Sequence, residues 1–163
     1  MGKSQWYIGS PNGVVLCVDH ASRWQIRGRL YHAYSREGLK IANMEQLLFE
    51  LEHFYDSIDF PHPSTNNRTF QGEIPHIGHR AGKEKVMSDE ELLGRHGDLG
   101  TFIIRVQHRQ NSSWQGRITW MDQDKTVYFR SMWEMLKLVD SALDTVSRWE
   151  DDRDEPTWPE ESE

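Results

Sequence analysis

Histidines are the residues of this chain best able to do chemistry, and one pair lies at matching points of two similar stretches. His20 and His108 both lie near the expected end of a strand. Acid–base catalysis by either one needs an orienting acid and a bound water or nucleophile. Asp19 is expected on the strand face opposite to His20, and Gln107 takes its place before His108. We therefore interpret both as structural residues, and an enzyme that uses either one is a third alternative.

A second group of histidines lies in an irregular stretch. His76 and His79 are three residues apart, with His62 and His96 in the same region. Zinc sites usually take four ligands on firm elements, often including thiolates, and the single cysteine, Cys17, lies far away in an apolar strand. The sequence also lacks a nucleophile elbow and a phosphate-binding glycine loop. It therefore predicts a protein with no catalytic residues, metal or cofactor.

The formal net charge of −7 comes from the C-terminal end of the chain. Residues 150–163 hold eight acidic residues and one basic residue, and the preceding body is balanced. Like charges together with Pro156 and Pro159 cannot pack, which predicts a disordered acidic tail. The tail is interpreted as a solubility element, or as an arm that competes with nucleic acid for a basic face.

The chain has no apolar run close to the roughly 20 residues that span a bilayer. Its N-terminus lacks the apolar core of a signal peptide, and a single thiol is typical of a reducing compartment. We therefore expect a soluble cytoplasmic protein without membrane partners. Its 163 residues allow one domain or two small ones, stabilised by packing.

Two stretches of the sequence align at an offset of 88 residues. Val18-Asp19-His20 matches Val106-Gln107-His108, and Gly28-Arg29-Leu30 matches Gly116-Arg117-Ile118. Between these segments each stretch has two residues that the other lacks, so the offset returns to 88 residues. Such length changes are typical of hairpin ends and bulges. The sequence therefore predicts an internal duplication.

Each stretch ends in the pattern of an amphipathic helix. Apolar residues follow the spacing i, i+3, i+4, i+7 and i+11, which places them on one helix face. Asn43 with Gln46, and Ser131 with Glu134, are typical capping pairs. The apolar positions are Met44, Leu47, Leu48, Leu51 and Tyr55 in the first stretch and Met132, Met135, Leu136, Val139 and Leu143 in the second.

Alternation of apolar and polar residues before each helix predicts three antiparallel strands. In the second stretch, His108 is expected to share the face of Val106. The expected fold class is α+β, with two tandem repeats of a three-stranded antiparallel sheet followed by an amphipathic helix. The segments are a first repeat at 1–56, an irregular linker at 57–100, a second repeat at 101–148 and the disordered acidic tail at 149–163.

The linker is expected to hold little regular structure, because prolines, glycines and an Asn-Asn pair interrupt it. Ser88 with Glu91, ahead of two leucines, predicts one short capped helix. Four apolar residues are candidates to anchor the linker on the core, namely Phe60, Phe70, Ile74 and Ile77.

The sheet face away from the helix is the most informative surface. In the second repeat, alternation places cationic, amide and aromatic side chains there without an acid: Arg105, Gln107, Arg109, Arg117, Tyr128 and Arg130. Arginines meet phosphates and an aromatic ring stacks on bases, which is typical of proteins that bind single-stranded nucleic acid. The alternative is an ordinary solvated face, or one used for docking between the repeats.

One tryptophan is a candidate anchor for a protein partner. Trp133 lies in the first turn of the second helix and off its apolar stripe, and Glu45 occupies the matching position in the first helix. An exposed tryptophan often carries much of the binding energy of an interface.

The tandem sheet-then-helix pattern resembles the PUR-repeat and PC4-like (Whirly-type) single-strand binders. The resemblance is carried by Val106-Gln107-His108, Gly116-Arg117-Ile118, Val127-Tyr128-Phe129 and the helix from Met132. It implies a sheet that binds single-stranded DNA or RNA. That family has four strands per unit, and Trp6-Tyr7-Ile8 is a candidate fourth strand of the first repeat.

Two further segments, Trp114-Gln115-Gly116 and Phe129-Arg130-Ser131, resemble small uncharacterised proteins of Gram-positive gut bacteria and their mobile elements. This resemblance implies an accessory role, and proteins of such elements include inhibitors of host defence such as anti-CRISPR proteins.

The leading hypothesis is a non-catalytic binding protein that contacts single-stranded nucleic acid through the outer sheet face of the second repeat. The alternative is a protein-binding inhibitor or adaptor of a mobile element, which would use the same face, Trp133 or the acidic tail. The sequence leaves open whether the repeats pack within one chain or exchange between chains of an oligomer.

Overall fold

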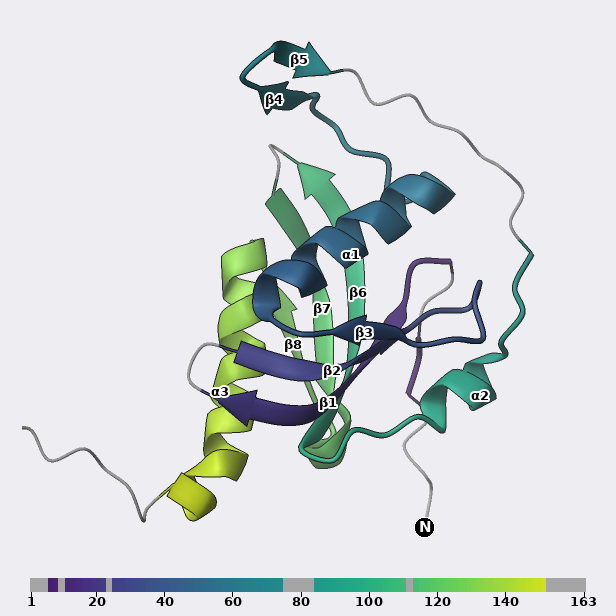
Figure 1. Cartoon of the computed structure of the whole chain (residues 1–163). Coiled ribbons are helices and arrows are strands. Elements are labelled where there is room, and N and C mark those ends of the chain that lie inside the picture. The colour runs from purple at the N-terminus through teal and green to yellow at the C-terminus, as the bar shows by residue number, and fades with distance from the viewer. Residues whose placement is uncertain (1–5, 9–10, 23–24, 75–83, 111–112, 152–163) are drawn as a thin grey trace, which may run out of the picture.

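The computed structural model describes residues 6–8, 11–22, 25–74, 84–110 and 113–151, and its main feature is one six-stranded antiparallel sheet (Figure 1). The strands lie in the order β3-β2-β1-β6-β7-β8. They are β1 (Val14–Ser22), β2 (Gln25–Tyr31), β3 (Leu39–Ile41), β6 (Gly100–Gln110), β7 (Ser113–Trp120) and β8 (Lys125–Phe129). The α-helices are α1 (Met44–Ile58), α2 (Asp89–Leu93) and α3 (Met132–Asp151), and a 3-10 turn, η1 (Met121–Gln123), links β7 to β8.

The α+β class predicted from the sequence is confirmed, but the strands do not form two separate three-stranded sheets. β1 pairs directly with β6, so that all six strands share one sheet. Two separate sheets would leave β1 and β6 with unpaired backbone groups along an edge. Joining them satisfies both edges and leaves only β3 and β8 at the borders of the sheet.

Positions that lie 88 residues apart have matching places in this sheet. At its centre, Val15 of β1 pairs with Ile103 of β6. A β-carbon at Gly28 or at Gly116 would overlap a backbone carbonyl of the neighbouring strand. Only glycine therefore fits these two positions, because a backbone carbonyl within a ladder cannot move aside as the end of a side chain can.

Each half of the sheet carries a β-bulge at the same point. The pairing of β1 with β2 skips Asp19, and the pairing of β6 with β7 skips Gln107. The extra residue shifts the alternation, so that side chains beyond it exchange faces. The predicted orientation of His108 is therefore wrong: His108 is exposed, and the next residue, Arg109, is buried on the helix side.

α1 and α3 pack on one face of the sheet and form a single core with it. Their starts are capped as predicted: Gln46 N donates to Asn43 Oδ1 at 2.8 Å, and Glu134 N donates to Ser131 Oγ at 3.1 Å. The buried helix residues are Leu47, Leu51, Phe54 and Tyr55 in α1 and Met135, Val139, Ala142 and Leu143 in α3.

The described residues cover the opposite face of the sheet only in part. In the half formed by β1 and β2, Ile8 and Leu92 of α2 pack against Val15 and Cys17 in a second, smaller core. Residues 6–8 do not form the predicted fourth strand, because they lie on this face instead of pairing with its edge.

The linker between the two halves contains the predicted short helix. Glu91 N donates to Ser88 Oγ at 3.2 Å at the start of α2, so the capping pair is confirmed. Ahead of it lies a small hairpin that the sequence did not predict, formed by β4 (Asn67–Thr69) and β5 (Gly72–Ile74).

The predicted anchoring of the linker is wrong where it can be followed. Phe60, which follows α1, is exposed. Phe70 and Ile74 are exposed because the hairpin that carries them stands away from the main sheet (Figure 1). Ile77, like His76 and His79, lies outside the described residues.

No helix in the described part of the chain is long and apolar enough to cross a bilayer. α3 continues to Asp151, so the first residues of the predicted tail are helical. The remainder of the tail, residues 152–163, lies outside the described residues.

Candidate functional site

Two arginines and a tyrosine form a row across the sheet face that α1 and α3 leave free. Arg105 of β6 pairs with Arg117 of β7, which in turn pairs with Tyr128 of β8. Side chains of directly paired residues point to the same face, with β-carbons about 5 Å apart. The neighbours of Arg105 and Arg117 along β6 and β7 include Ile104, Val106 and Ile118, which are buried in the helix-side core. The row therefore points away from the helices.

The N-terminal segment adds a second tyrosine to this row. The Tyr7 ring centroid lies 5.2 Å from the Arg105 guanidinium carbon, and Trp6 Nε1 donates to Asp124 Oδ1 at 2.9 Å. A hollow of about 210 Å³ lies between this segment and the strands, and the side chains of both arginines line it. We name Tyr7, Arg105, Arg117 and Tyr128 the arginine row.

The two arginines of the row have no acidic partner among the described residues, where neither forms an ion pair. Arg105 Nε is buried and without a hydrogen-bond partner in that part of the chain. Asp124 also lines the hollow, and its carboxylate accepts the hydrogen bond from Trp6. Like charges directly opposite one another destabilise a sheet, so a bound anion would relieve the repulsion between Arg105 and Arg117.

Arg109 does not belong to this face, although the sequence analysis placed it there. The bulge at Gln107 turns it toward α1, where its side chain is 4% exposed. Its Nη1 donates to Asp56 Oδ1 at 2.7 Å and its Nε to the Pro61 carbonyl at 2.6 Å, and its guanidinium lies over the Tyr55 ring. Arg109 is therefore a structural residue that ties β6 to α1 and to the loop after it.

The other two predicted site residues are not part of the arginine row. Gln107 is the bulged residue and is half-buried. Arg130 follows β8 and is exposed, with its Nη2 3.0 Å from Glu134 Oε2. Exposed ion pairs are weak, so this pair contributes little to stability.

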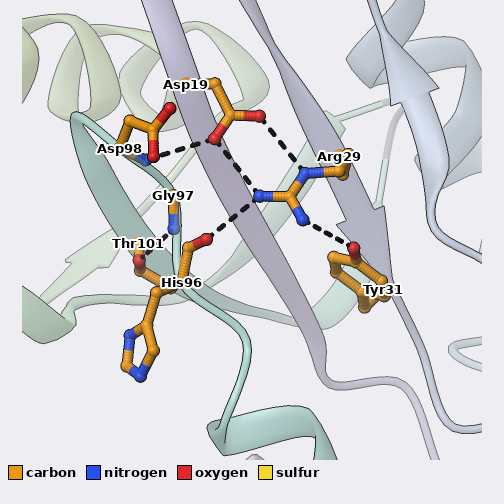
Figure 2. A network of polar contacts seen from close by, with 7 residues as sticks. All are labelled: Asp19, Arg29, Tyr31, His96, Gly97, Asp98 and Thr101. Atoms are coloured by element: carbon orange, nitrogen blue, oxygen red, sulfur yellow. Dashed lines mark hydrogen bonds and ion pairs between the residues drawn. The ribbon is translucent and has the colours of Figure 1, made fainter.

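In the first half of the sheet, the arginine at the position equivalent to Arg117 is held by hydrogen bonds to neighbouring groups (Figure 2). Arg29 occupies the position 88 residues before Arg117, and its Nε and Nη2 both donate to the Asp19 carboxylate at 3.2 Å. Its Nη1 donates to Tyr31 Oη at 2.8 Å, and its Nη2 also donates to the His96 carbonyl at 3.0 Å. Every nitrogen of this guanidinium is thus occupied.

The loop that follows α2 closes the first half over this pair. Asp98 N donates to Asp19 Oδ1 at 3.1 Å, and Gly97 N donates to Thr101 Oγ1 at 3.0 Å (Figure 2). In the second half, Gln107 stands where Asp19 stands in the first. The acid that pairs with Arg29 therefore has no counterpart at the equivalent position beside Arg117.

The Asp19 carboxyl couples stability to pH. Burial acts to raise its pKa, but the hydrogen bonds from Arg29 and from Asp98 N outweigh this, and the pKa lies below its ordinary value of 3.8. A carboxyl with a lowered folded-state pKa stabilises the fold above the unfolded pKa and loses that contribution as the pH falls through the folded pKa.

We expect Asp19→Asn to lower the free energy of unfolding at pH 7 by no more than about 1 kcal/mol, since the pair is partly exposed. The difference between the variant and the wild type should shrink at pH 3, where the carboxylate of the unfolded wild type is already largely protonated. Urea unfolding at both pH values measures this. A difference that stays the same at pH 3 would show that the ion pair is not its cause.

Two of the features considered for chemistry can be followed in the described residues. Cys17 is buried, and burial raises the pKa of its thiol to about 11. In the part of the chain that is described, no three His, Cys, Asp or Glu residues are grouped closely enough to hold a metal ion. Trp133, the candidate partner anchor, is exposed, with Lys137 Nζ 5.7 Å from its ring centroid.

Comparison with known proteins gives no match: no protein-family model, no curated protein and no solved structure matches this chain.

Sequence reasoning missed the N-terminal part of the site. Trp6 and Tyr7 were interpreted only as strand residues, yet they reach β6 and the turn before β8. Thr119 and Thr126 also line the hollow, with their hydroxyl oxygens 2.8 Å apart. Alternation from Arg117 already predicts Thr119 on this face, but the contact between segments about 100 residues apart has no local signal.

Proposed function

We propose that this protein binds single-stranded nucleic acid through the arginine row. The observation that carries the proposal is the direct pairing of Arg105 with Arg117, without an acidic partner in the described structure, between two exposed tyrosines. Tyr7 is 65% exposed and Tyr128 is 66% exposed. No acidic residue occurs in β6, β7 or β8.

The chemistry of the row suits a single strand better than a duplex. Arginines attract phosphates, and exposed rings stack on bases that are not already paired. The row lies on a sheet, which offers successive strand positions at a spacing of about 4.8 Å. A strand running from β8 toward the N-terminal segment would therefore meet Tyr128, Arg117, Arg105 and Tyr7 in turn.

The test is the affinity of the full chain for fluorescein-labelled dT15 and rU15, measured by fluorescence anisotropy at several salt concentrations. We expect the Arg105→Glu, Arg117→Glu double variant to bind at least 100-fold more weakly, because two attractive phosphate contacts become repulsive. The slope of log affinity against log salt should also become less negative by roughly 1.4, the value for two phosphates on a single strand. Unchanged affinity in this variant would contradict the proposal.

The matched control is the Arg68→Glu, Lys137→Glu double variant. It changes the net charge by the same amount, but Arg68 lies on β4 and Lys137 on α3, away from the arginine row. We expect it to retain its affinity within about twofold. An equal loss in both double variants would show that net charge, and not the row, controls binding.

The exposed Trp133 supports a second candidate function, which is binding of a protein partner. Such an association would depend little on salt and would be lost in Trp133→Ala. Nucleic-acid binding through the arginine row should be unaffected by that substitution.

We also infer that the two halves of the chain are copies of one strand-strand-strand-helix unit. The central pairing of Val15 with Ile103, the two bulges and the two obligatory glycines, Gly28 and Gly116, support this inference, because each lies 88 residues from its counterpart. A duplicated unit with a nucleic-acid-binding sheet is what the resemblance to PUR-repeat and Whirly-type proteins implies. On this interpretation, the first copy kept the closed face and the second kept the open one.

A further inference from the structure

The solvent side of α1 carries a second stripe of residues, distinct from the one that packs on the sheet. Its residues follow the spacing i, i+4, i+7 and i+11 and are Glu45, Phe49, Glu52 and Asp56. Such residues share one helix face. Leu48 lies at the border of this stripe, where it also packs against the sheet core. Phe49 at the centre of this stripe is 71% exposed, so an apolar ring is held in water without a partner among the described residues.

A groove of about 260 Å³ lies beside this stripe, on the helix side of the sheet. Leu48 and Phe49 form one wall, the loop at Pro63–Asn67 forms another, and Trp114 and Met132 contribute from β7 and the start of α3. The exposed surface of the groove is mostly apolar. It is large enough for one or two aliphatic side chains.

The charged groups at the mouth of the groove are acidic. Glu45 and Glu52 line it, and Glu50 lies beside Phe49 in an adjoining depression. None of these three carboxylates forms an ion pair within the described structure. The α1 side of the rim therefore carries negative charge that no ion pair in the described structure compensates.

The one cation among the groove-lining residues cannot neutralise this rim. Arg109 lines the groove but is 4% exposed, and its guanidinium is already bound to Asp56 and to the Pro61 carbonyl. Its charge is directed into the fold, where it faces the Tyr55 ring. Among the groove-lining residues, the charged groups that are open to solvent are therefore carboxylates.

We propose that this groove docks a basic segment of a partner protein, with an aliphatic side chain in the apolar centre and flanking lysines or arginines on the rim. Charge complementarity selects this occupant, because Glu45, Glu50 and Glu52 border the apolar centre along its α1 side. The acidic C-terminal tail of the chain itself carries the wrong charge. The arginine row lies on the opposite face of the sheet, so the two sites can be occupied together.

The probes are two labelled 14-residue peptides with identical leucine positions, one carrying lysine and the other glutamate at every other position. We expect the full chain to bind the lysine peptide at least tenfold more tightly in fluorescence anisotropy. The Glu45→Lys, Glu52→Lys double variant should lose this preference, and Phe49→Ala should weaken binding of the lysine peptide about tenfold. All three positions are on the solvent side of α1, so the circular dichroism spectrum should not change.

The matched control is Asp140→Lys, Asp144→Lys on α3, which alters the net charge equally and should leave peptide affinity within about twofold. Affinity for dT15 should be at least as high in the groove variants as in the wild type, which separates this site from the arginine row. The proposal is overturned if neither peptide binds, if the glutamate peptide binds as well as the lysine peptide, or if the control variant loses as much affinity as the groove variant.

Discussion

Replacing Gly116 with alanine is expected to destabilise the protein severely. The added β-carbon would overlap the carbonyl oxygen of Arg105 on the neighbouring strand. That oxygen lies in the ladder between β6 and β7, so β7 must move away from β6 to accommodate the methyl group. Overpacking of this kind costs about 3 kcal/mol, and urea unfolding followed by circular dichroism measures it. We expect Gly28→Ala to have a similar effect, because its β-carbon would overlap the Cys17 carbonyl.

The control for this prediction is Gly94→Ala at the end of α2. There a β-carbon would lie 3.4 Å from the Glu90 carbonyl oxygen, and the backbone has a right-handed conformation that any residue adopts. We expect its free energy of unfolding to stay within about 0.5 kcal/mol of the wild type. If Gly116→Ala were as stable as Gly94→Ala, the close approach of β6 and β7 at this point would be incorrect.

Arg109→Ala is expected to lower stability and leave nucleic-acid binding unchanged. The substitution removes the buried guanidinium from Tyr55 and leaves the Pro61 carbonyl without its donor. Loss of a buried charged hydrogen bond and of the packing of the side chain costs about 2 kcal/mol. Asp56 is 44% exposed at its side chain, so water can solvate the carboxylate that remains. Urea unfolding and dT15 anisotropy on the same sample measure both properties.

The companion variant is Arg117→Ala, for which we expect the reverse result. Its side chain is half-buried and has no ion pair among the described residues, so stability should change little. Its affinity for dT15 should fall, because one phosphate contact is lost. Weaker binding in Arg109→Ala with unchanged stability would mean that the bulge at Gln107 does not turn Arg109 toward the helices. Arg109 would then lie on the outer sheet face, as the sequence predicts.

The helices and the cores of the strands could be predicted because their signals are local. A capping pair such as Ser131 with Glu134 acts within one turn, and an apolar stripe repeats at the helical period. The α+β class and the start of each main helix follow from such signals alone. The same holds for α2, which is short but has the capping pair Ser88 and Glu91 at its start.

The orientation of the last residues of β6 could not be predicted from alternation. A bulge inserts one residue into a strand, and its effect on every later side chain depends on pairing with the next strand. The sequence contained a trace of this event. Val18 and Gly28 recur as Val106 and Gly116 at an offset of 88 residues, while the segments between them differ in register. Only the pairing itself identifies Gln107 as the extra residue.

The sequence by itself determined the six main strands and the helices of this protein, the apolar faces of the two long helices and the placement of Arg105, Arg117 and Tyr128 on one side of their strands. These properties depend on spacings of two to four residues, which the backbone geometry converts directly into faces. The tertiary structure decided that six strands share one sheet, that Arg109 is buried, and that Tyr7 joins the arginine row. Each of these depends on contacts between segments tens of residues apart, where the gain from pairing edges and burying side chains is determined by the whole fold and not by neighbouring residues.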